Sequence, residues 1–404
     1  MLFSFSLSTL IFSLVSKNKV LKVYFKGLFI TTGMLYVNSL INTLNAKKVT
    51  YILVIEGMVF LRSVITNLVG RDLITTQEWS IEELRATLKV AKELKRMYYY
   101  LGPSRIPDYL KKKVFVMLFY APSTRTRSAF ETAMELLGGH AQYVEARMTR
   151  MGEGEALKDV AKMYEIFGDA VGIRILDKAI DYKYGEGHKV IREVAKYANV
   201  PVINMADDQE HPTQALGDIM TMEEKLGNVR GKKFVIMWGY APVIRGYCSI
   251  HADMLIATRF GMDVVIAHPP GFELPEKYVE WAKQNAKESG GSIEFVNDYR
   301  QALEGAHAVF PRSWCSRKLA ELGASKFGEE ELRMYQKYRD WRLKMEDLDL
   351  MDKRGIITHV LPVLRGYEAD DEVMDSPRSV IYEQAENNMF AKAAVLLLTM
   401  GGLV

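Results

Sequence analysis

Short apolar runs alternate with amphipathic stretches along the chain from about residue 67 to its end. The runs are rich in β-branched and aromatic residues, which favours buried strands. We expect strands over residues 114–120, 142–146, 170–174, 200–204, 233–238, 263–268, 292–296, 308–311 and 356–358. Strands that alternate with helices in this way predict an α/β fold, with two doubly wound parallel-sheet domains linked by interdomain helices.

The stretches between the strands carry apolar residues on one face at helical spacing. They predict helices over residues 75–95, 124–137, 156–167, 189–198, 211–226, 249–260, 275–289, 298–304 and 385–400. Ser80, followed by Glu82 and Glu83, is a natural cap for the first of these helices. Residues 320–342 are highly charged and predict a solvated helical insertion.

The N-terminal part of the chain has a different pattern. We expect residues 1–66 to form an apolar extension, residues 67–208 a first domain completed by the C-terminal helix 380–404, and residues 209–379 a second domain. None of the apolar patches in the extension reaches the roughly 20 uninterrupted residues that a bilayer span needs. A membrane location is therefore not expected. A signal peptide or anchor stays an alternative, and Met58 is a candidate start.

Composition narrows the class of protein. Charged residues make up 25% of the chain and the formal net charge is +3, a balance that does not indicate a nucleic-acid partner or disorder. Cys248 and Cys315 lie far apart without metal-ligand spacing, which favours free thiols in a reducing cytoplasm. The chain carries no phosphate-binding Gly-rich motif and no metal-ligand motif, so no cofactor is expected.

One predicted strand-to-helix junction has the chemistry of an anion site. The strand 114–120 is broken by Pro122, and Ser123 is a natural N-cap for the helix that follows. Arg125, Arg127, neighbouring threonine hydroxyls and the free amides of the helix N-terminus would then converge on one point. This arrangement suits a phosphate or another doubly charged anion. The alternative is a capped surface helix with two solvated arginines.

The spelling Ser-Thr-Arg-Thr-Arg over residues 123–127, followed in order by His-Pro-Thr-Gln over 211–214, resembles the aspartate/ornithine carbamoyltransferase family. The resemblance covers residues 67–400. It implies that residues 67–208 bind carbamoyl phosphate and that residues 209–379 bind an amino acid. It implies a donor site whose residues bind the phosphate, bridge the phosphate and the carbonyl oxygen, contact the carbamoyl group or orient the amine through a backbone carbonyl. These residues are Ser123, Thr124, Arg125, Thr126, Arg174, His211, Gln214 and Leu361. Among these, Arg125, Arg174, His211 and Gln214 would be catalytic.

The signals for the amine acceptor conflict. Residues 204–211 have the ornithine-type spacing from Asn to His, whereas Arg245 and Ser249 keep the spacing of the aspartate enzymes. Residues 238–242, 258–264 and 311–314 resemble the knotted branch that includes N-acetylornithine and N-succinylornithine carbamoyltransferases. Arg312 would suit a substrate carboxylate or an acylated α-nitrogen. The alternative is that Arg312 simply faces solvent. The acceptor-binding residues implied by the resemblance are Asn204, Asp208, Arg245, Arg312, Trp314, His359, Leu361 and Arg365.

The leading interpretation is transfer of a carbamoyl group to the δ-amine of ornithine or an N-acylornithine, a citrulline-forming step of arginine biosynthesis. Aspartate carbamoyltransferase is the alternative enzyme. A catalytically weak, ligand-binding relative is the other alternative, because Asn388 and Val360 stand where ornithine-type enzymes carry Arg and Cys. The resemblance also implies a homotrimer, or a multiple of trimers, in which the loop 149–155 serves a neighbour's site.

Overall fold

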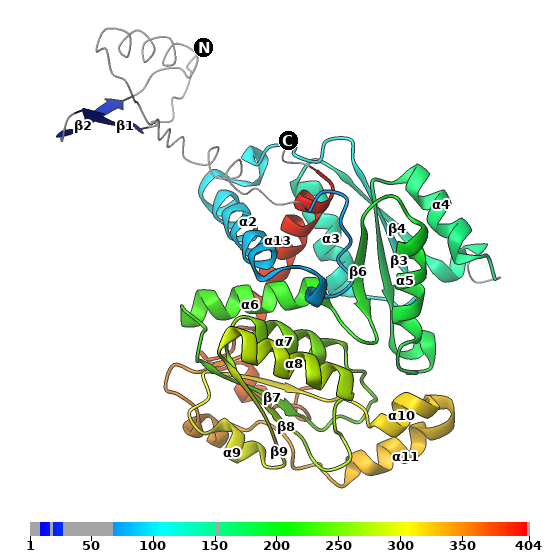
Figure 1. The fold of residues 1–404 in the computed structure, drawn as a ribbon. Helices are drawn as coiled ribbons and strands as arrows, with labels where there is room; N and C mark the ends of the chain where they lie inside the picture. The colour runs from blue at the N-terminus through cyan, green and yellow to red at the C-terminus, as the bar shows by residue number, and fades with distance from the viewer. Residues whose placement is uncertain (1–8, 17–18, 27–67, 151–153, 402–404) are drawn as a thin grey trace. The chain divides into compact units, whose positions relative to one another are not determined.

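The computed structural model describes residues 9–16, 19–26, 68–150 and 154–401. The chain divides into two units, residues 1–65 and 66–404, which are described separately. In the first unit, β1 (Thr9–Ser16) and β2 (Lys19–Lys26) form an antiparallel pair. Met58 and most of the other apolar patches of the predicted extension lie outside the described residues. The other elements labelled in Figure 1 belong to the second unit.

The first sheet of this unit has four parallel strands in the order β4-β3-β5-β6. They are β3 (Val114–Phe119), β4 (His140–Glu145), β5 (Ala170–Ile175) and β6 (Val202–Asp207). The connecting helices are α3 (Thr124–Leu136), α4 (Leu157–Phe167) and α5 (Glu186–Tyr197). Strand β3 is buried from Phe115 to Phe119 because it lies inside the sheet and is covered on both faces.

The second sheet has five parallel strands in the order β11-β10-β7-β8-β9. They are β7 (Lys233–Trp238), β8 (Asp263–Ala267), β9 (Ser292–Val296), β10 (Ala308–Arg312) and β11 (Ile356–Ile357). Its helices include α7 (Cys248–Arg259), α8 (Glu276–Ser289), α9 (Tyr299–Leu303) and α12 (Asp371–Met374). The predicted fold class, with two parallel α/β sheets, is confirmed (Figure 1). The exact domain boundaries stay a prediction.

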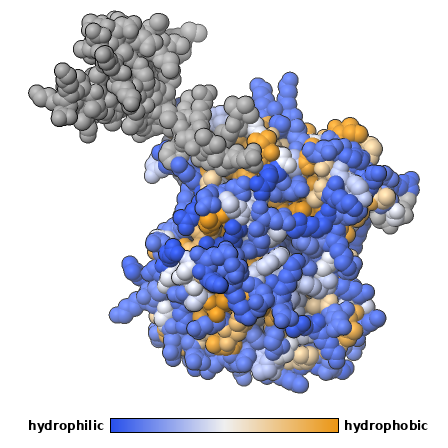
Figure 2. All heavy atoms as spheres, in the orientation of Figure 1, coloured by the Kyte–Doolittle hydropathy of each residue, from blue (hydrophilic) through white to orange (hydrophobic). Residues whose placement is uncertain are grey.

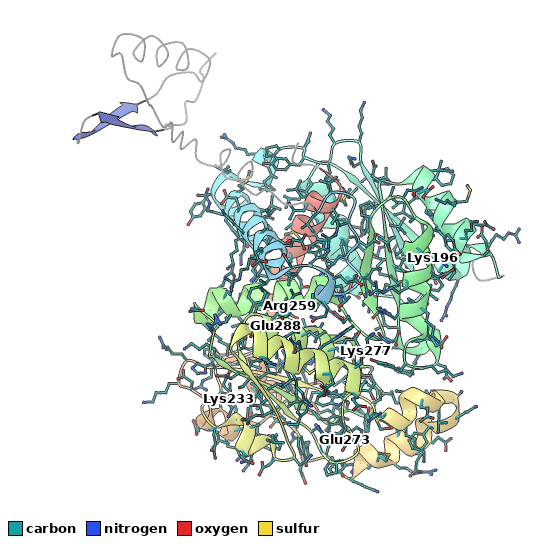
Figure 3. All side chains as sticks on the ribbon, in the orientation of Figure 1. Lys196, Lys233, Arg259, Glu273, Lys277 and Glu288 are labelled. Carbon is teal, nitrogen blue, oxygen red and sulfur yellow. The ribbon has the colours of Figure 1, made fainter. Side chains whose placement is uncertain are left out.

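Three helices join the two halves: α2 (Ile81–Leu101), α6 (Pro212–Leu226) and α13 (Ile381–Thr399). Helix α13 packs against α2, α3 and α6. Helix α6 is buried on all sides from Pro212 to Met222, as expected for a helix enclosed by protein. Arg259, labelled in Figure 3, lies at the end of α7 and donates through its guanidinium to the backbone carbonyl of Thr76. This bond ties the second half to the segment that precedes α2.

The charged segment predicted as a solvated insertion forms α10 (Arg317–Leu322) and α11 (Ala324–Gln336). The prediction of helices is confirmed, but one face is not solvated. Tyr335 is fully buried, with its ring 5.2 Å from that of Trp238 and 5.4 Å from that of Phe272. The carboxylate of Glu331 is buried and accepts a 2.6 Å hydrogen bond from the backbone N–H of Ser316.

The face of the molecule in Figure 2 is mostly hydrophilic, with hydrophobic residues in small separate groups. Isolated apolar side chains of this kind are normal on a folded protein and need no partner. Among the described residues, none of the helices combines the length and the hydropathy that a membrane crossing requires.

Candidate active site

A cavity of about 350 Å³ lies where strands of both sheets end. The first half contributes residues that follow β3 and β5, and the second half contributes the end of β10 and residues that follow β7 and β11. Ligands of parallel α/β sheets bind at these carboxyl ends. Of the predicted site residues, the lining includes Ser123, Arg125, Thr126, Arg174, His211, Gln214, Arg245, Arg312, His359 and Leu361.

The N-terminus of α3 forms one wall. Ser123 caps the helix as predicted, because its Oγ accepts a 3.1 Å hydrogen bond from the N–H of Thr126. Thr124 is the first helical residue, is exposed and does not line the cavity. The expected convergence of two guanidiniums is wrong. Only Arg125 faces the cavity, whereas Arg127 lies 3.9 Å from the ring centre of Tyr143. Two residues along a helix turn about 200°, which points the side chains in different directions.

Guanidiniums dominate the charge of the cavity. The Nε atoms of Arg174, Arg245 and Arg312 are buried and have no hydrogen-bond partner among the described residues. Burial lowers the pKa of Arg125, and the neighbouring charges of Arg174, Arg312 and Arg245 lower it further. Asp177 is the one carboxylate in the described lining. Such a concentration of guanidiniums, three of them with an Nε donor still unused, attracts anions with more than one negative charge.

Asp177 was missed in the sequence analysis, although its position two residues after β5 was a usable signal. Burial raises the pKa of its carboxyl, while Arg174, Arg312 and Arg245 lower it. Asp177 has φ 55° and Leu361 has φ 56°, in the left-handed region that side chains other than glycine avoid. Both line the cavity, and backbone strain of this kind is concentrated at functional sites.

His211 and Gln214 enter the cavity from the start of α6, where His211 is the N-cap residue. Burial lowers the pKa of His211 well below its usual value, and the charges of Lys392 and Arg174 add to this effect. The imidazole is therefore neutral at pH 7. Gln214 donates from Nε2 to Asp218 Oδ1 at 2.7 Å. Its carbonyl oxygen is thus the end of the amide that a ligand can use.

The opposite wall is built around His359. Its Nδ1 accepts a 2.8 Å hydrogen bond from the N–H of Leu361, so its proton lies on Nε2, 3.4 Å from a carboxylate oxygen of Glu368. Glu368 is fully buried and lies 3.6 Å from Arg312. Burial alone would raise the pKa of Glu368, but Arg312, His359 and the N–H of Ser313 hold it at about 2. Glu368 therefore stays ionised and fixes both cavity residues in place.

Two predicted acceptor-binding residues lie outside the cavity and serve the first sheet. Asn204 is fully buried, donates to the carbonyl of Ile74 at 2.9 Å and accepts from the N–H of Ala206 at 3.0 Å, where the β5–β6 register shifts. Asp208 accepts from the backbone N–H groups at the start of α5, including that of His188 at 3.0 Å. Both side chains are occupied by backbone groups that would otherwise be unsatisfied.

Two more predicted acceptor-binding residues belong to the second half but do not reach the cavity. Trp314 is fully buried, and its Nε1 donates to the carbonyl of Phe272 at 2.8 Å. Arg365 points to the surface, where it forms two hydrogen bonds of 2.9 and 2.7 Å with Asp375 and one of 3.1 Å with Asp371. The placement of Arg365 agrees with the alternative of a surface arginine.

Several cavity residues were absent from the predicted site. From α13 the lining includes Gln384, Asn388 and Lys392, and from the loop and helix after β7 it includes Cys248 and Ser249. A usable signal existed for Lys392, which is the one charged residue in the otherwise apolar stretch 389–400.

Two family models match the chain. The model described as aspartate/ornithine carbamoyltransferase, carbamoyl-P binding domain, matches residues 71–224. The model described as aspartate/ornithine carbamoyltransferase, Asp/Orn binding domain, matches residues 231–399.

Individual relatives match over nearly their whole length. The chain is 38% identical over 339 residues to the anabolic ornithine carbamoyltransferase of Pyrococcus furiosus, and this match covers 84% of the chain and 99% of the relative. It is 32% identical over 349 residues to the N-acetylornithine carbamoyltransferase of Xanthomonas campestris pv. campestris, which covers 82% of this chain and 98% of the relative.

Solved structures agree with this. The ornithine carbamoyltransferase from Pyrococcus furiosus superposes with a TM-score of 0.73 at 36% identity, over 84% of this chain and 100% of that one. The structure of acetylornithine transcarbamylase complexed with acetylcitrulline superposes with a TM-score of 0.73 at 31% identity, over 81% of this chain and 98% of that one. By its two domain models, by relatives above 30% identity and by its fold, the chain belongs to the aspartate/ornithine carbamoyltransferase family.

Proposed function

We propose that the protein transfers the carbamoyl group of carbamoyl phosphate to the δ-amine of ornithine or an N-acylornithine, which forms a citrulline-type product and phosphate. One observation carries the proposal. The cavity gathers Arg125, Arg174, Arg245 and Arg312 against a single described carboxylate, Asp177. A dianionic acyl phosphate and an acceptor with a carboxylate would together neutralise this charge.

The donor would bind at the N-terminus of α3. Its phosphate would accept hydrogen bonds from the first helical N–H groups, from the hydroxyls of Ser123 and Thr126, and from Arg125 and Arg174. Thr126 and Arg174 are already close, with Oγ1 and Nη1 3.5 Å apart. The same two residues would reach the carbonyl oxygen, so phosphate binding and carbonyl polarisation are coupled.

The carbamoyl group would lie between His211 and Gln214. A neutral imidazole can donate one hydrogen bond to the carbonyl oxygen without competing with the guanidiniums for the phosphate. The carbonyl oxygen of Gln214 would accept from the carbamoyl NH2. Donors placed where negative charge develops lower the barrier by about 3 kcal/mol each.

The attacking δ-amine has a pKa near 10, so its neutral form costs roughly 4 kcal/mol at pH 7. Desolvation in the cavity lowers that cost. The amine nitrogen bonds to the carbamoyl carbon as the carbon–oxygen bond to phosphate breaks, and the departing phosphate takes the amine proton. No protein base is required. The carbonyl of Leu361, whose N–H is held by His359 on the opposite wall, would orient the amine.

The second half of the cavity bears on which acceptor is used. Arg245 and Arg312 would bind the acceptor's carboxylate, and their charge opposes a free α-ammonium close by. Asp177 is the one carboxylate of the described lining, and the ionised Glu368 behind that wall already lies 3.6 Å from Arg312. Acylation of the α-nitrogen removes the charge, so we propose N-acylornithine as the better acceptor. Relatives named for ornithine and for N-acetylornithine are both similar to this chain.

The experiment is a panel of amines assayed with carbamoyl phosphate: ornithine, N-acetylornithine, N-succinylornithine, aspartate and putrescine. We expect donor-dependent product with an ornithine-type acceptor and the highest kcat/KM with an acylated one. Product from aspartate alone would replace the proposal with the aspartate reaction, for which the retained spacing of Arg245 and Ser249 is the favouring feature. Donor binding without product from any amine would indicate a ligand-binding relative.

The proposed assembly is a homotrimer or a multiple of trimers, in which the loop 149–155 completes a neighbour's site. Residues 151–153 of this loop lie outside the described residues. The proposed setting is arginine biosynthesis in the cytoplasm. Light scattering of the purified protein would give the mass of the assembly, and a monomer would contradict this part of the proposal.

A further inference from the structure

Lys392 is a buried lysine whose hydrogen-bond acceptors among the described residues are neutral. Its side chain extends from α13, is 2% exposed and lines the cavity. Its Nζ bonds to Asn388 Oδ1 at 2.9 Å and approaches the Asn388 carbonyl at 3.4 Å, and both acceptors are neutral. Among the described residues, no carboxylate oxygen lies within 4 Å of it. A buried ammonium with only neutral partners is costly, and a bound anion would supply the opposite charge that these partners lack.

The surroundings of Lys392 place it at the donor end of the cavity. Helix α13 packs against α3 and α6, whose N-termini carry Arg125 and His211. The Nζ lies 5.5 Å from the ring centre of Phe130 on α3, and its charge lowers the pKa of His211. Two helix N-termini, each with partial positive charge, thus meet an ammonium at one end of the cavity.

The orientation of Lys392 is set by a network of amides. Asn388 donates from Nδ2 to Asp218 Oδ1 at 3.2 Å, which turns its Oδ1 toward Lys392. The same Asp218 oxygen accepts from Gln214 Nε2 at 2.7 Å. Gln214 and Lys392 are therefore held by one carboxylate, although they come from α6 and α13.

We infer that Lys392 is an additional donor-binding residue, whose ammonium contacts the negatively charged end of the bound carbamoyl phosphate. This rests on the proposed function. The contact would add a cation to the phosphate site formed by Arg125 and Arg174, and it would stabilise the charge that develops on the departing phosphate.

The titration of Lys392 makes the inference measurable. Burial lowers its pKa to about 7, with Asp218 opposing and Arg174 adding to the shift. The groups that face it are His211 and Asp218 from α6, Arg174 from β5 and the uncharged Phe130 from α3. A bound dianion favours the ammonium, so binding above pH 7 takes up a proton and weakens as the pH rises. Below about pH 7 the lysine is already charged and no such uptake is expected.

The test uses phosphonoacetamide, a stable analogue of carbamoyl phosphate, and titration calorimetry at pH 6 and pH 8 in two buffers of different ionisation enthalpy. For Lys392→Gln at pH 6 we expect a Kd roughly 10- to 100-fold higher than that of the full-length wild type, as for a lost charge-assisted hydrogen bond. We also expect the proton uptake seen with the wild type at pH 8 to be smaller in the variant. The ligand's own titration is common to both proteins and cancels.

Two further variants separate binding from structure. Lys392→Arg keeps the charge at all pH values and should retain more affinity at pH 8 than Lys392→Gln. Lys95→Gln is the matched control. Lys95, on α2, bonds at 2.7 Å to Oδ1 of Asn387, which lies on α13 like Lys392, but Lys95 does not line the cavity. Its Kd and proton uptake should equal those of the wild type.

Each outcome has a distinct meaning. No binding of phosphonoacetamide by the wild type would overturn the proposed function, and this inference with it. Tight binding by the wild type and equal affinity and proton uptake by Lys392→Gln would overturn the inference alone. If Lys392→Gln fails to fold, the pH dependence of the wild type is the test. Affinity and proton uptake of the wild type that follow only the ligand's own titration between pH 6 and pH 8 would also overturn the inference.

Discussion

Arg125 and Arg127 lie two positions apart at the start of α3, but only Arg125 lines the cavity. Arg127 pairs with Glu131 at 2.8 Å and lies over the ring of Tyr143. We expect Arg125→Ala to lower kcat/KM about 100-fold, the effect of losing one strong transition-state contact. Arg127→Ala should stay within a few-fold of the wild type. Steady-state kinetics, with melting temperatures as a check on folding, would compare the two, and equal losses would contradict the assignment.

A second pair of arginines separates acceptor binding from surface pairing. Arg245 lines the cavity with an unpartnered Nε, whereas Arg365 is occupied by Asp371 and Asp375. We expect Arg245→Gln to raise the acceptor KM about tenfold or more, with little change in the donor KM. For Arg365→Gln we expect an unchanged acceptor KM, because exposed ion pairs contribute little. An acceptor KM that responds to Arg365 instead would restore it as a carboxylate clamp.

Helices α6 and α13 meet at Asp218, which organises the amides that line this part of the cavity. One of its oxygens accepts from Gln214, Gln384 and Asn388 at 2.7, 2.7 and 3.2 Å. Burial raises the pKa of Asp218, and its amide partners lower it, whereas burial and the charge of Asp218 both raise the pKa of Asp253. Asp253 is therefore the member of this buried pair that holds the proton more strongly. As a result, Gln214 on α6 and Gln384 and Asn388 on α13 are held in one fixed orientation.

Replacing this hub should disturb the donor site as a unit. In Asp218→Asn the new amide brings two hydrogens toward donors that need an acceptor, so we expect Gln214 to lose its orientation. The donor KM should rise and kcat should fall, together by about 100-fold in kcat/KM, while the acceptor KM changes less. Asp263→Asn, at the start of β8 and bonded to Ser292 at 2.8 Å, is the control. A variant that loses only stability would contradict the positioning role.

At the scale of the whole molecule, the described residues that line the cavity all belong to the unit 66–404. Both family models also fall within this unit. We therefore expect a protein that begins at Thr66 to retain the melting temperature and the kcat/KM of the full chain within about twofold. Parallel purification, calorimetry and kinetics would check this. A large loss of activity on removal of residues 1–65 would show that the site depends on them.

Much of the fold could be predicted because the pattern of apolar and polar residues within each short segment indicates whether it forms a strand or a helix. Apolar runs marked the strands from β3 to β11, of which the edge strands β4 and β9 are partly exposed. The prediction for β6 missed only its last residues, where Asn204 stabilises a change of register. Caps were also local, as the bonds from the N–H of Glu83 to Ser80 and from the N–H of Thr126 to Ser123 demonstrate. The Ser-Thr-Arg-Thr-Arg spelling likewise marked the start of α3, which lines the cavity with Ser123, Arg125 and Thr126.

The sequence by itself determined the class of fold and the family, because these depend on periodicity, capping and short motifs. Only the tertiary structure decided which polar side chains face the cavity. Asn204 bonds to backbone groups around its own strand and Asp208 to backbone groups at the start of α5, whereas Asp177 and Lys392 reach the cavity from elements far apart in the chain. The direction of a side chain depends on strand order and helix packing over long sequence separations, and a local pattern does not contain that information.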